Sequence, residues 1–592
     1  MKKKLAAAPF CLNDAQIAWV EDTLASLSTE DRLRQLFCLI TYSDDAEELR
    51  RLAEQVRPGG VMSRPVPAEQ ALRTVRTLQE HSRIPLLISA NLEAGGSGLL
   101  SDGTLFAKPM AIAATDDAEQ ARRLGEICGT EGSAVGANWA FAPIVDIDYN
   151  WRNPITNTRT FGSDPERVRR MGVAYVTELQ KHGMAACCKH FPGDGRDERD
   201  QHIAPSINDL SCGEWDRSYG MVYRAAITAG VQSIMIGHIL QPAYSRRFRP
   251  ELRDGELLPA SVSYELVTDL LRGQLGFNGL IVTDSSTMAG VTAFLPREQL
   301  VPQSIAAGCD MFLFTKDLEE DFSFLANGLR KGIFTEERLA EAVTRILALK
   351  AALRLPEKRD AGCLVPHSDE ALSRIAPPLF ADWSRDCADR AITLVKEEPG
   401  VLPLTPERYP RVLYCPLDNK GAGQSFFSGE ATANRRFADL LRASGFTVTV
   451  FEPAPGLEGF MTPVRETVGK YDLILYAAEL VTKSNQTVVR PEWSSPMGAN
   501  VPVWCHSVPT VFVSFENPYH LVDVPQVRTF VNCYGGSELF LRAALSKLMG
   551  KSRFLGKSPV DPFCGKWECK HVGEDLGAPP QTPPKPFLRR KV

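Results

Sequence analysis

The amino-acid sequence predicts an α/β protein in which an N-terminal (β/α)8 TIM-like barrel precedes a C-terminal α/β sandwich domain. Three features support this prediction: repeated short apolar runs in the first part of the chain, a proline-containing break after them, and a second series of apolar runs beyond the break. A chain of 592 residues is also longer than one hydrophobic core usually organises, so at least two domains are expected.

The first part of the chain, 1–355, alternates strand-like runs with segments long enough for a helix or a loop. This alternation is typical of parallel βα units, and eight such units suit a closed barrel. In a barrel of this kind, functional residues lie on the loops after the carboxyl ends of the strands. The predicted strands are 33–40, 59–63, 85–91, 138–142, 184–190, 233–239, 279–284 and 309–314.

Prolines interrupt the helical pattern in 356–380, where we place an interdomain linker. The next segment, 381–572, contains further strand-like runs and the helix-like 432–443, which together predict an open doubly wound sheet. The last stretch, 573–592, is rich in proline and basic at its end, which favours a disordered or surface-wrapping tail. The strand-like runs of the second domain are 410–415, 447–452, 472–477, 510–515 and 528–533.

Composition narrows the possible partners and the compartment. A formal net charge of -5 disfavours nucleic acid as a partner, and no apolar run approaches the roughly 18 residues that span a membrane. Several of the 14 cysteines lie in strand-like runs, including the adjacent Cys187 and Cys188, which indicates reduced thiols and a cytoplasmic location. The basic start of the chain is similar to a secretory leader, but Asn13 and Asp14 interrupt its apolar segment.

One stretch places titratable side chains just beyond a predicted barrel strand. The apolar run 184–188 leads into Lys189-His190-Phe191-Pro192-Gly193, and Asp200-Gln201-His202 follows within one loop. In an extended loop, side chains two residues apart share a side, so the Asp200 carboxylate can accept the imidazole N–H of His202 and raise its basicity. Such a histidine can shuttle a proton. The alternative is a salt-bridged surface loop, because charged residues fill 196–199.

A second carboxylate ends another predicted strand. The buried-type run 279–283 leads directly to Asp284, the position expected for a nucleophile at the mouth of a barrel. The alternative reading of Asp284 is a helix cap. Lys189 and His190 supply charged groups of the kind that hydrogen-bond the hydroxyls of a sugar.

The stretch 189–202 resembles the signature of glycoside hydrolase family 3, in its β-N-acetylglucosaminidase branch. That pattern reads Lys-His-(Phe/Ile)-Pro-Gly-(His/Leu)-Gly, four free residues, then Asp-(Ser/Thr)-His, and the spacing matches throughout. Two positions depart from it, because Asp194 stands where the family has His or Leu, and Gln201 where it has Ser or Thr. Asp194 adds a negative charge near the shuttle, which bears on the pKa of the histidine.

The resemblance implies roles for further residues. It makes Asp284 the nucleophile, with Met288 following as in the family, and His202 with Asp200 the acid/base dyad. Arg159, in a segment similar to the family's Arg-Ser-Phe-Gly element, is expected to bind the sugar. Asn91 occupies the position of a sugar-gripping aspartate, and the amide loses charge-assisted strength. Asn91 begins the segment Asn91-Leu92-Glu93-Ala94-Gly95-Gly96, where the family reads Asp-x-Glu-Gly-Gly. The arginine that the acetylglucosaminidases carry shortly after those glycines has no counterpart in 97–101. His238 also sits where the family has a histidine, with a packed supporting role as an equal possibility.

These observations together predict a retaining exo-acting β-N-acetylglucosaminidase whose substrate is a small carbohydrate and which needs no cofactor. Cys564, Cys569 and His571 lack the paired spacing of a zinc site, so no metal is expected. Three alternatives stay open: a phosphorylase that uses phosphate in place of water, a β-glucosidase of the same family, and a catalytically weak sugar-binding protein. A homo-oligomer is possible, and the second domain is expected to serve packing or oligomerisation.

Overall fold

The computed structural model describes residues 2–418, 432–452, 461–494 and 498–572. Eight parallel strands close a barrel in the order β1-β10-β9-β7-β5-β4-β3-β2, as the sequence predicted. The strands are short and almost completely buried, which explains why they read as apolar runs. Their bounds are β1 Phe37–Ile40, β2 Gly60–Met62, β3 Leu87–Ala90, β4 Trp139–Ala140, β5 Ala185–Phe191, β7 Ser233–Ile236, β9 Leu280–Ser285 and β10 Met311–Leu313.

The start of the barrel differs from the prediction that 33–40 is one strand. Residues 33–35 belong to helix α3 (Thr29–Gln35), and β1 begins only at Phe37. The helix starts where the Ser28 side chain accepts the backbone N–H of Asp31, and an ion pair between Glu30 and Arg34 lies along its surface. The apolar character of Leu33 therefore serves a helix that packs on the barrel.

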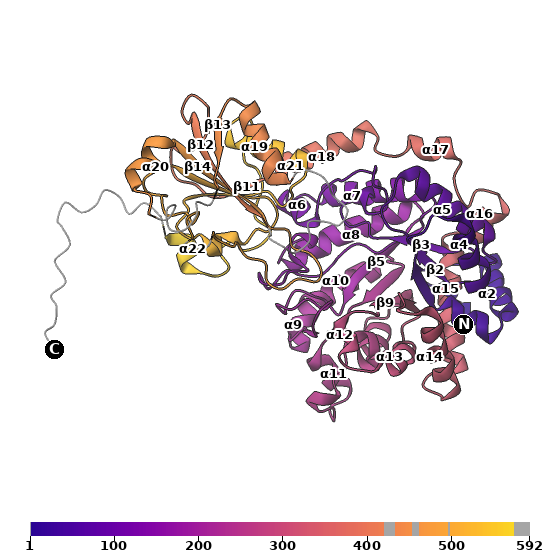
Figure 1. Ribbon diagram of the computed structural model, residues 1–592. Helices are drawn as coiled ribbons and strands as arrows, with labels where there is room; N and C mark the ends of the chain where they lie inside the picture. Colours follow the sequence, from indigo (N-terminus) through magenta and orange to yellow (C-terminus); the bar gives the residue numbers. More distant parts are fainter. Residues whose placement is uncertain (1, 419–431, 453–460, 495–497, 573–592) are drawn as a thin grey trace, which may run out of the picture.

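Helices surround the barrel and account for most of the remaining chain (Figure 1). The largest helix–helix contact joins α7 and α8, and α8 also packs against strand β5. The helices of this part are α1 Lys2–Ala6, α2 Asp14–Ser26, α3, α4 Ala46–Arg51, α5 Ala68–His81, α6 Pro109–Ala114, α7 Ala118–Ala134, α8 Pro165–Lys181, α9 Cys212–Arg217, α10 Tyr219–Thr228, α11 Pro242–Phe248, the wider-turn helix Glu265–Gln274, α12 Ala289–Thr292, α13 Arg297–Ala307, α14 Leu318–Arg330 and α15 Glu336–Ala352.

A charged cluster fastens the end of the barrel opposite the carboxyl ends of its strands. Asp310, fully buried just before β10, accepts hydrogen bonds from Arg272 and Arg338, and Arg345 lies 3.4 Å from it. Burial raises the pKa of Asp310, but the three guanidinium groups outweigh it and hold that pKa below its usual value. The carboxylate therefore joins two helical segments, Glu265–Gln274 and α15, to one strand.

The second domain is built on a six-stranded sheet of order β11-β16-β15-β14-β12-β13, with a single antiparallel pair between β11 and β16. This mixed sheet agrees with the predicted α/β sandwich. Each predicted strand overlaps an observed one: β12 and β14 are longer than predicted, and β13, β15 and β16 are shorter. The tail 573–592 lies outside the described residues. The elements are β11 Thr393–Lys396, β12 Arg411–Asp418, α19 Ala433–Ala443, β13 Thr447–Val450, α20 Val464–Lys470, β14 Leu473–Glu479, β15 Thr510–Ser514, β16 Thr529–Asn532, α21 Glu538–Leu548 and α22 Trp567–His571.

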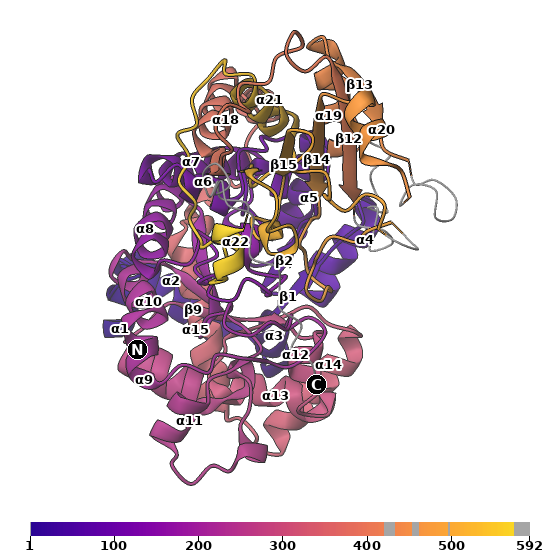
Figure 2. The same ribbon diagram turned by 90° about the vertical axis from the view of Figure 1, so that its left-hand side faces the viewer.

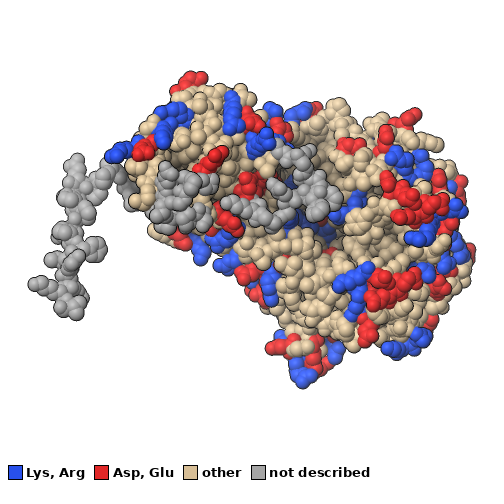
Figure 3. All heavy atoms as spheres, in the orientation of Figure 1, with Lys and Arg blue, Asp and Glu red and all other residues tan. Residues whose placement is uncertain are grey.

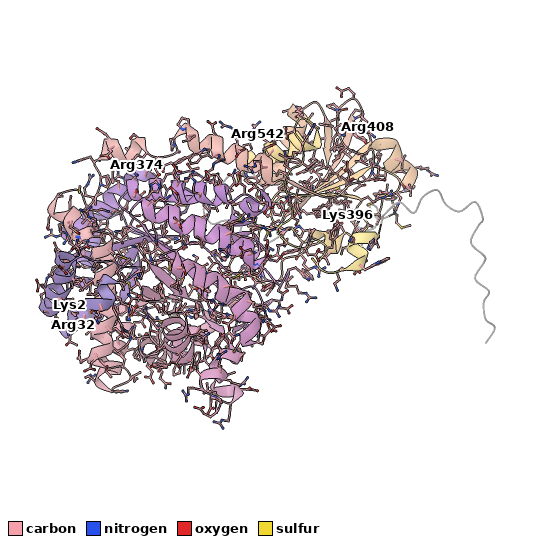
Figure 4. All side chains as sticks on the ribbon, turned by 180° about the vertical axis from the view of Figure 1, so that it is seen from behind. Lys2, Arg32, Arg374, Lys396, Arg408 and Arg542 are labelled. Carbon is pink, nitrogen blue, oxygen red and sulfur yellow. The ribbon has the colours of Figure 1, made fainter. Side chains whose placement is uncertain are left out.

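Three helices connect the barrel to the second domain: α16 (Leu355–Asp360), α17 (Ser368–Ser373) and α18 (Pro378–Ala391). They run along the outside of the barrel helices, so the second sheet lies beside the barrel (Figures 1 and 2). Arg374, labelled in Figure 4, lies just after α17 and donates a hydrogen bond to the Ser133 hydroxyl of α7. The connection is therefore packed against the barrel along its length.

Direct contacts also join the two domains near the barrel mouth. The Asn157 amide donates to the Asn517 side chain at 3.3 Å, and the Tyr519 hydroxyl donates to the buried Asp148 carboxylate. On the face drawn in Figure 3, acidic and basic side chains are interspersed over both domains. Among the described residues, no helix combines the length and apolar character needed to cross a membrane.

Candidate active site

A cavity of about 630 Å³ opens at the carboxyl ends of the barrel strands and extends to the second domain. Most of the side chains that the sequence singled out meet there. Asp284 and His202 both line it, together with Asn91, Arg159, Lys189 and His190. Further lining residues are Met62, Arg64, Glu93, Lys108, Phe141, Ile155, Met235, Phe314 and, from the second domain, Val481, Thr482, Lys483 and Ser484.

Asp284 lies at the carboxyl end of β9, and its two carboxylate oxygens differ in their hydrogen bonding. Its Oδ1 accepts the backbone N–H of Ser285 at 2.7 Å. Its Oδ2 is buried, receives no hydrogen bond from the described part of the chain, and lies 3.9 Å from His190 Nε2. Burial raises the pKa of Asp284, but the nearby imidazoles, His190 first, hold it below its usual value. A buried, ionised oxygen without a donor is suited to act as a nucleophile.

His202 is held by Asp200 in the manner that the sequence predicted. Its Nδ1 lies 2.6 Å from Asp200 Oδ1, which also accepts the His202 backbone N–H at 2.9 Å. Burial lowers the pKa of His202, but the hydrogen bond to Asp200 and the charge of Asp284 outweigh it and raise the pKa above the usual value. The same contact lowers the pKa of Asp200 despite its burial. The dyad therefore favours the protonated form of the imidazole.

The loop that carries His202 is tied to the barrel by its backbone. The carbonyl of His202 accepts the N–H of Ala289 at 3.1 Å, and the carbonyl of Gln201 accepts the N–H of Gly290 at 2.9 Å. Gly290 permits this approach because a Cβ there would meet the Gln201 carbonyl oxygen at 2.6 Å. These bonds bring the loop beside the segment that follows the Asp284 strand.

The two residues that depart from the family pattern contact each other. The Gln201 side-chain N–H donates to Asp194 Oδ2 at 3.1 Å, while its oxygen accepts the backbone N–H of His238 at 2.6 Å. Asp194 is buried and also accepts from Asn153 and Gly195. Burial and the negative charge of Asp146 raise the pKa of Asp194 to about 7. Asp194 thus supports the residue before His202 and does not lie as a free charge beside the imidazole.

Three of the four expected sugar-binding side chains, those of Arg159, Lys189 and Asn91, belong to one network with Glu93. Glu93 accepts two hydrogen bonds from Arg159, at 3.0 and 2.9 Å, and lies 2.8 Å from Lys189 Nζ. Although burial raises its pKa, these two cations hold the pKa of Glu93 well below its usual value. Lys189 Nζ also donates to Asn91 Oδ1 at 3.3 Å. No role was predicted for Glu93 from the sequence, and the structure places it between the two cations.

Two further histidines are oriented by fixed partners. His190 Nδ1 lies 2.7 Å from Asp146 Oδ2, so its Nε2 faces Asp284. His238 is buried between the Ser261 hydroxyl, at 2.7 Å, and the carbonyl of Ser285, at 2.8 Å. His238 therefore contacts the backbone next to Asp284 and is not among the residues that line the cavity, which agrees with a supporting role. Asp146 was missed as an orienting group, although it ends an apolar run just as Asp284 does.

The second domain contributes to the wall of the cavity, although packing or oligomerisation was its expected role. Its loop 481–484 lines the cavity, and Glu516 forms an ion pair with Lys108, another lining residue. No local pattern marks these positions in the sequence. Cys564, Cys569 and His571 do not form a metal site, and no group of three or more His, Cys, Asp or Glu in the described ranges could hold a metal ion.

Comparisons with known proteins agree with this arrangement. Residues 28–349 match the model of the glycosyl hydrolase family 3 N-terminal domain. A curated relative from Cellulomonas fimi, named beta-N-acetylglucosaminidase/beta-glucosidase, is 55% identical over 566 residues, which cover 95% of this chain and 99% of the relative.

Two solved structures extend the likeness over both domains. A beta-glucoside phosphorylase, BglX, is 44% identical with a TM-score of 0.89, and the match covers 96% of this chain and 100% of that one. A family 3 beta-N-acetylglucosaminidase from Paenibacillus is 27% identical with a TM-score of 0.76, covering 91% and 99% respectively.

Proposed function

The chain belongs to glycoside hydrolase family 3, and from that premise we propose that it removes terminal β-linked N-acetylglucosamine by double displacement. One observation carries the proposal. Asp284, whose buried Oδ2 accepts no hydrogen bond from the described residues, lines the same cavity as the His202 imidazole, which Asp200 orients. Retaining glycosidases need this pair of functions, a nucleophile close to the anomeric carbon and a group that protonates the departing oxygen.

In the proposed first step, Asp284 attacks the anomeric carbon while His202 Nε2 donates its proton to the glycosidic oxygen. Asp200 stays ionised, accepts a hydrogen bond from the Nδ1–H of His202 and stabilises the imidazolium. The aglycone leaves and the sugar is covalently bound to Asp284. In the second step, the now neutral His202 takes a proton from water, which attacks the same carbon and releases the sugar with its original configuration.

Side chains around Asp284 are proposed to hold the sugar. Lys189, Arg159 and Asn91 present hydrogen-bonding groups at one wall of the cavity. Glu93 joins Arg159 to Lys189, and Lys189 donates to Asn91. His190, held by Asp146, faces the nucleophile from another strand. Because these groups come from the ends of different strands, they can contact several hydroxyls of one ring, which favours removal of a single terminal sugar.

The test is a set of nitrophenyl β-glycosides with variants at the two proposed catalytic positions. We expect His202→Ala to lose about 100-fold or more on substrates that need an acid, the usual contribution of general acid catalysis, and to retain activity on dinitrophenyl glycosides. Asp284→Asn should abolish turnover of both classes. A fluorinated activated sugar should label Asp284 covalently. Labelling at another carboxylate, or equal loss on both classes in His202→Ala, would refute the mechanism.

Phosphate as the acceptor is a second candidate with its own support. After the first step the neutral imidazole does not repel an anion as a carboxylate would, and Arg64, Lys108 and Lys483 line the cavity. The similarity to a protein named a beta-glucoside phosphorylase agrees with this reading. Saturating phosphate should then yield sugar 1-phosphate. Free sugar as the sole product under that condition would leave water as the acceptor.

A β-glucoside is the alternative to an N-acetylglucosaminide as substrate, because the Cellulomonas fimi relative carries both names. The ratio of kcat/KM for nitrophenyl N-acetylglucosaminide and glucoside measures it, and a ratio above one supports the main proposal. We further propose a cytoplasmic location, supported by the free thiols, of which most are buried. Fractionation that recovers the protein outside the cytoplasm would contradict this.

A further inference from the structure

The acid/base dyad contacts both domains. Asp200 uses one carboxylate oxygen, Oδ1, for His202, and its other oxygen, Oδ2, accepts the backbone N–H of Asn485 at 2.6 Å. Asn485 belongs to the second domain, 285 positions further along the chain. We propose that the backbone N–H of Asn485 positions Asp200, and through it the proton donor His202, so that the second domain takes part in the acid/base step.

The direction of this N–H is fixed by the local backbone. Asn485 has φ +66°, in the left-handed region that Asn tolerates better than most residues. The neighbouring turn is braced by Gln486, whose buried side chain accepts the backbone N–H of Lys483 at 3.0 Å. The N–H therefore points at Asp200 from a shaped turn, and the contact is a charge-assisted hydrogen bond of short length.

The position of this turn gives the contact a chemical consequence. Residues 481–484 line the cavity immediately before Asn485, so the same loop borders the substrate and holds the dyad. Among the described residues, the Asp200 carboxylate accepts hydrogen bonds from His202 itself and from Asn485, so the turn supplies its one anchor outside the histidine. An acid must be held closely to be effective, and a displaced carboxylate would misalign the proton.

The inference rests on the proposed role of His202 and is tested by removing one hydrogen. Asn485→Pro lacks the N–H and cannot adopt positive φ, whereas Asn485→Gly keeps the N–H and adopts positive φ freely. Two substrates of the same sugar show how far the rate depends on proton donation. One is a methyl glycoside, whose leaving group needs a proton, and the other is a dinitrophenyl glycoside, whose leaving group does not. General acid catalysis contributes about 100-fold or more, and partial misalignment should cost part of that.

We expect Asn485→Pro to lower kcat/KM about tenfold or more on the methyl glycoside and less than about threefold on the dinitrophenyl glycoside, a fraction of the general-acid contribution. Asn485→Gly should restore the methyl glycoside rate. Gln486→Ala loosens the turn without changing Asn485. It should lower kcat/KM less than Asn485→Pro does, and again more on the methyl glycoside than on the dinitrophenyl glycoside. This second variant keeps the test decisive if the proline variant fails to fold.

His202→Ala, assayed in parallel, separates the two hypotheses. If it spares the dinitrophenyl substrate while Asn485→Pro and Gln486→Ala affect both substrates equally or neither, the positioning role of Asn485 is overturned and the proposed mechanism stands. If His202→Ala itself shows no dependence on the leaving group, the proposed mechanism fails and the inference fails with it.

Discussion

Exchanging the partners of the Asp194–Gln201 hydrogen bond provides a direct test of how the His202 loop is held. In Asp194→Asn, two side-chain N–H donors face each other, and in Gln201→Glu, two carboxylates do. The double variant places the Asn donor against a Glu acceptor and leaves the second Glu oxygen for the backbone N–H of His238. The hydrogen bond is thereby rebuilt with its polarity reversed.

The expected coupling follows from the two favourable pairs in the cycle. A hydrogen bond to a charged group is worth about 1.5–3 kcal/mol, and both the parent protein and the double variant contain one while the single variants do not. The coupling free energy should therefore be about 3 kcal/mol, twice the lower limit. The cost of burying the Asp194 charge differs between single variants, but such single-site contributions cancel in a double-mutant cycle.

The coupling should depend on pH. The folded pKa of Asp194, about 7, lies above its unfolded value, so its stabilising contribution is complete below about pH 4 and is lost as the pH rises through 7. At pH 8 the two carboxylates of Gln201→Glu are both ionised and repel each other. At pH 5.5 they can share a proton, as paired carboxylates do, and the coupling should shrink.

Urea unfolding at both pH values, followed by tryptophan fluorescence, measures the coupling. Trp139 and Trp215 are fully buried in the barrel and report its transition. Additive effects at pH 8, with a coupling below the usual additivity error of about 0.5 kcal/mol, would refute the pairing of Asp194 with Gln201.

Three further predictions concern charge. Asp200→Ala should move the basic limb of kcat/KM to lower pH, because His202 acts in its protonated form and Asp200 raises its pKa; a pH profile with an unchanged limb would contradict this. Asn91→Asp should lower the KM for the terminal sugar about three- to tenfold by adding a charge-assisted contact, and steady-state kinetics with an equal or higher KM would count against a sugar contact there. Asp310→Leu should cost about 3–5 kcal/mol of stability, because three arginines lose their buried counter-charge. The exposed pair of Asp209 with Arg196 is the control: Asp209→Ala should cost less than about 1 kcal/mol, and equal shifts of the two melting temperatures would argue against the cluster.

The parts of the site that the sequence predicted are those whose partners lie nearby in the chain or at strand ends. Asp200 and His202 are two residues apart, so local geometry was sufficient to predict their hydrogen bond. Asp284 follows a buried strand, and the barrel rule places such a residue at the mouth. The role of Glu93 was not predicted, because its partners Arg159 and Lys189 come from other strand ends and meet it only in the closed barrel.

Asp194 and Gln201, which depart from the family pattern, show a second kind of contact that the sequence alone does not predict. Taken one at a time, a carboxylate and an amide in a loop are unremarkable polar residues, and Asp194 was read as a charge acting on the histidine. Their contact forms because the loop folds back so that residues seven positions apart meet in the interior. A spacing of seven in an irregular loop has no periodic signature, so only the folded chain identifies the pair as one unit.

The contribution of the second domain follows from the same rule that located the barrel site. Ligands of parallel sheets bind beyond the carboxyl ends of the strands. Strand β14 ends at Glu479, and the loop that follows it carries both the lining residues 481–484 and Asn485. The carboxyl end of β9, at Asp284, borders the same cavity. Because strand ends from two sheets meet at one cavity, any change in how the domains pack alters the distance between Asn485 and Asp200. On the proposed mechanism the interface is part of the catalytic geometry, and substitutions at the Lys108–Glu516 contact should affect substrates with poor leaving groups before they affect the fold of either domain.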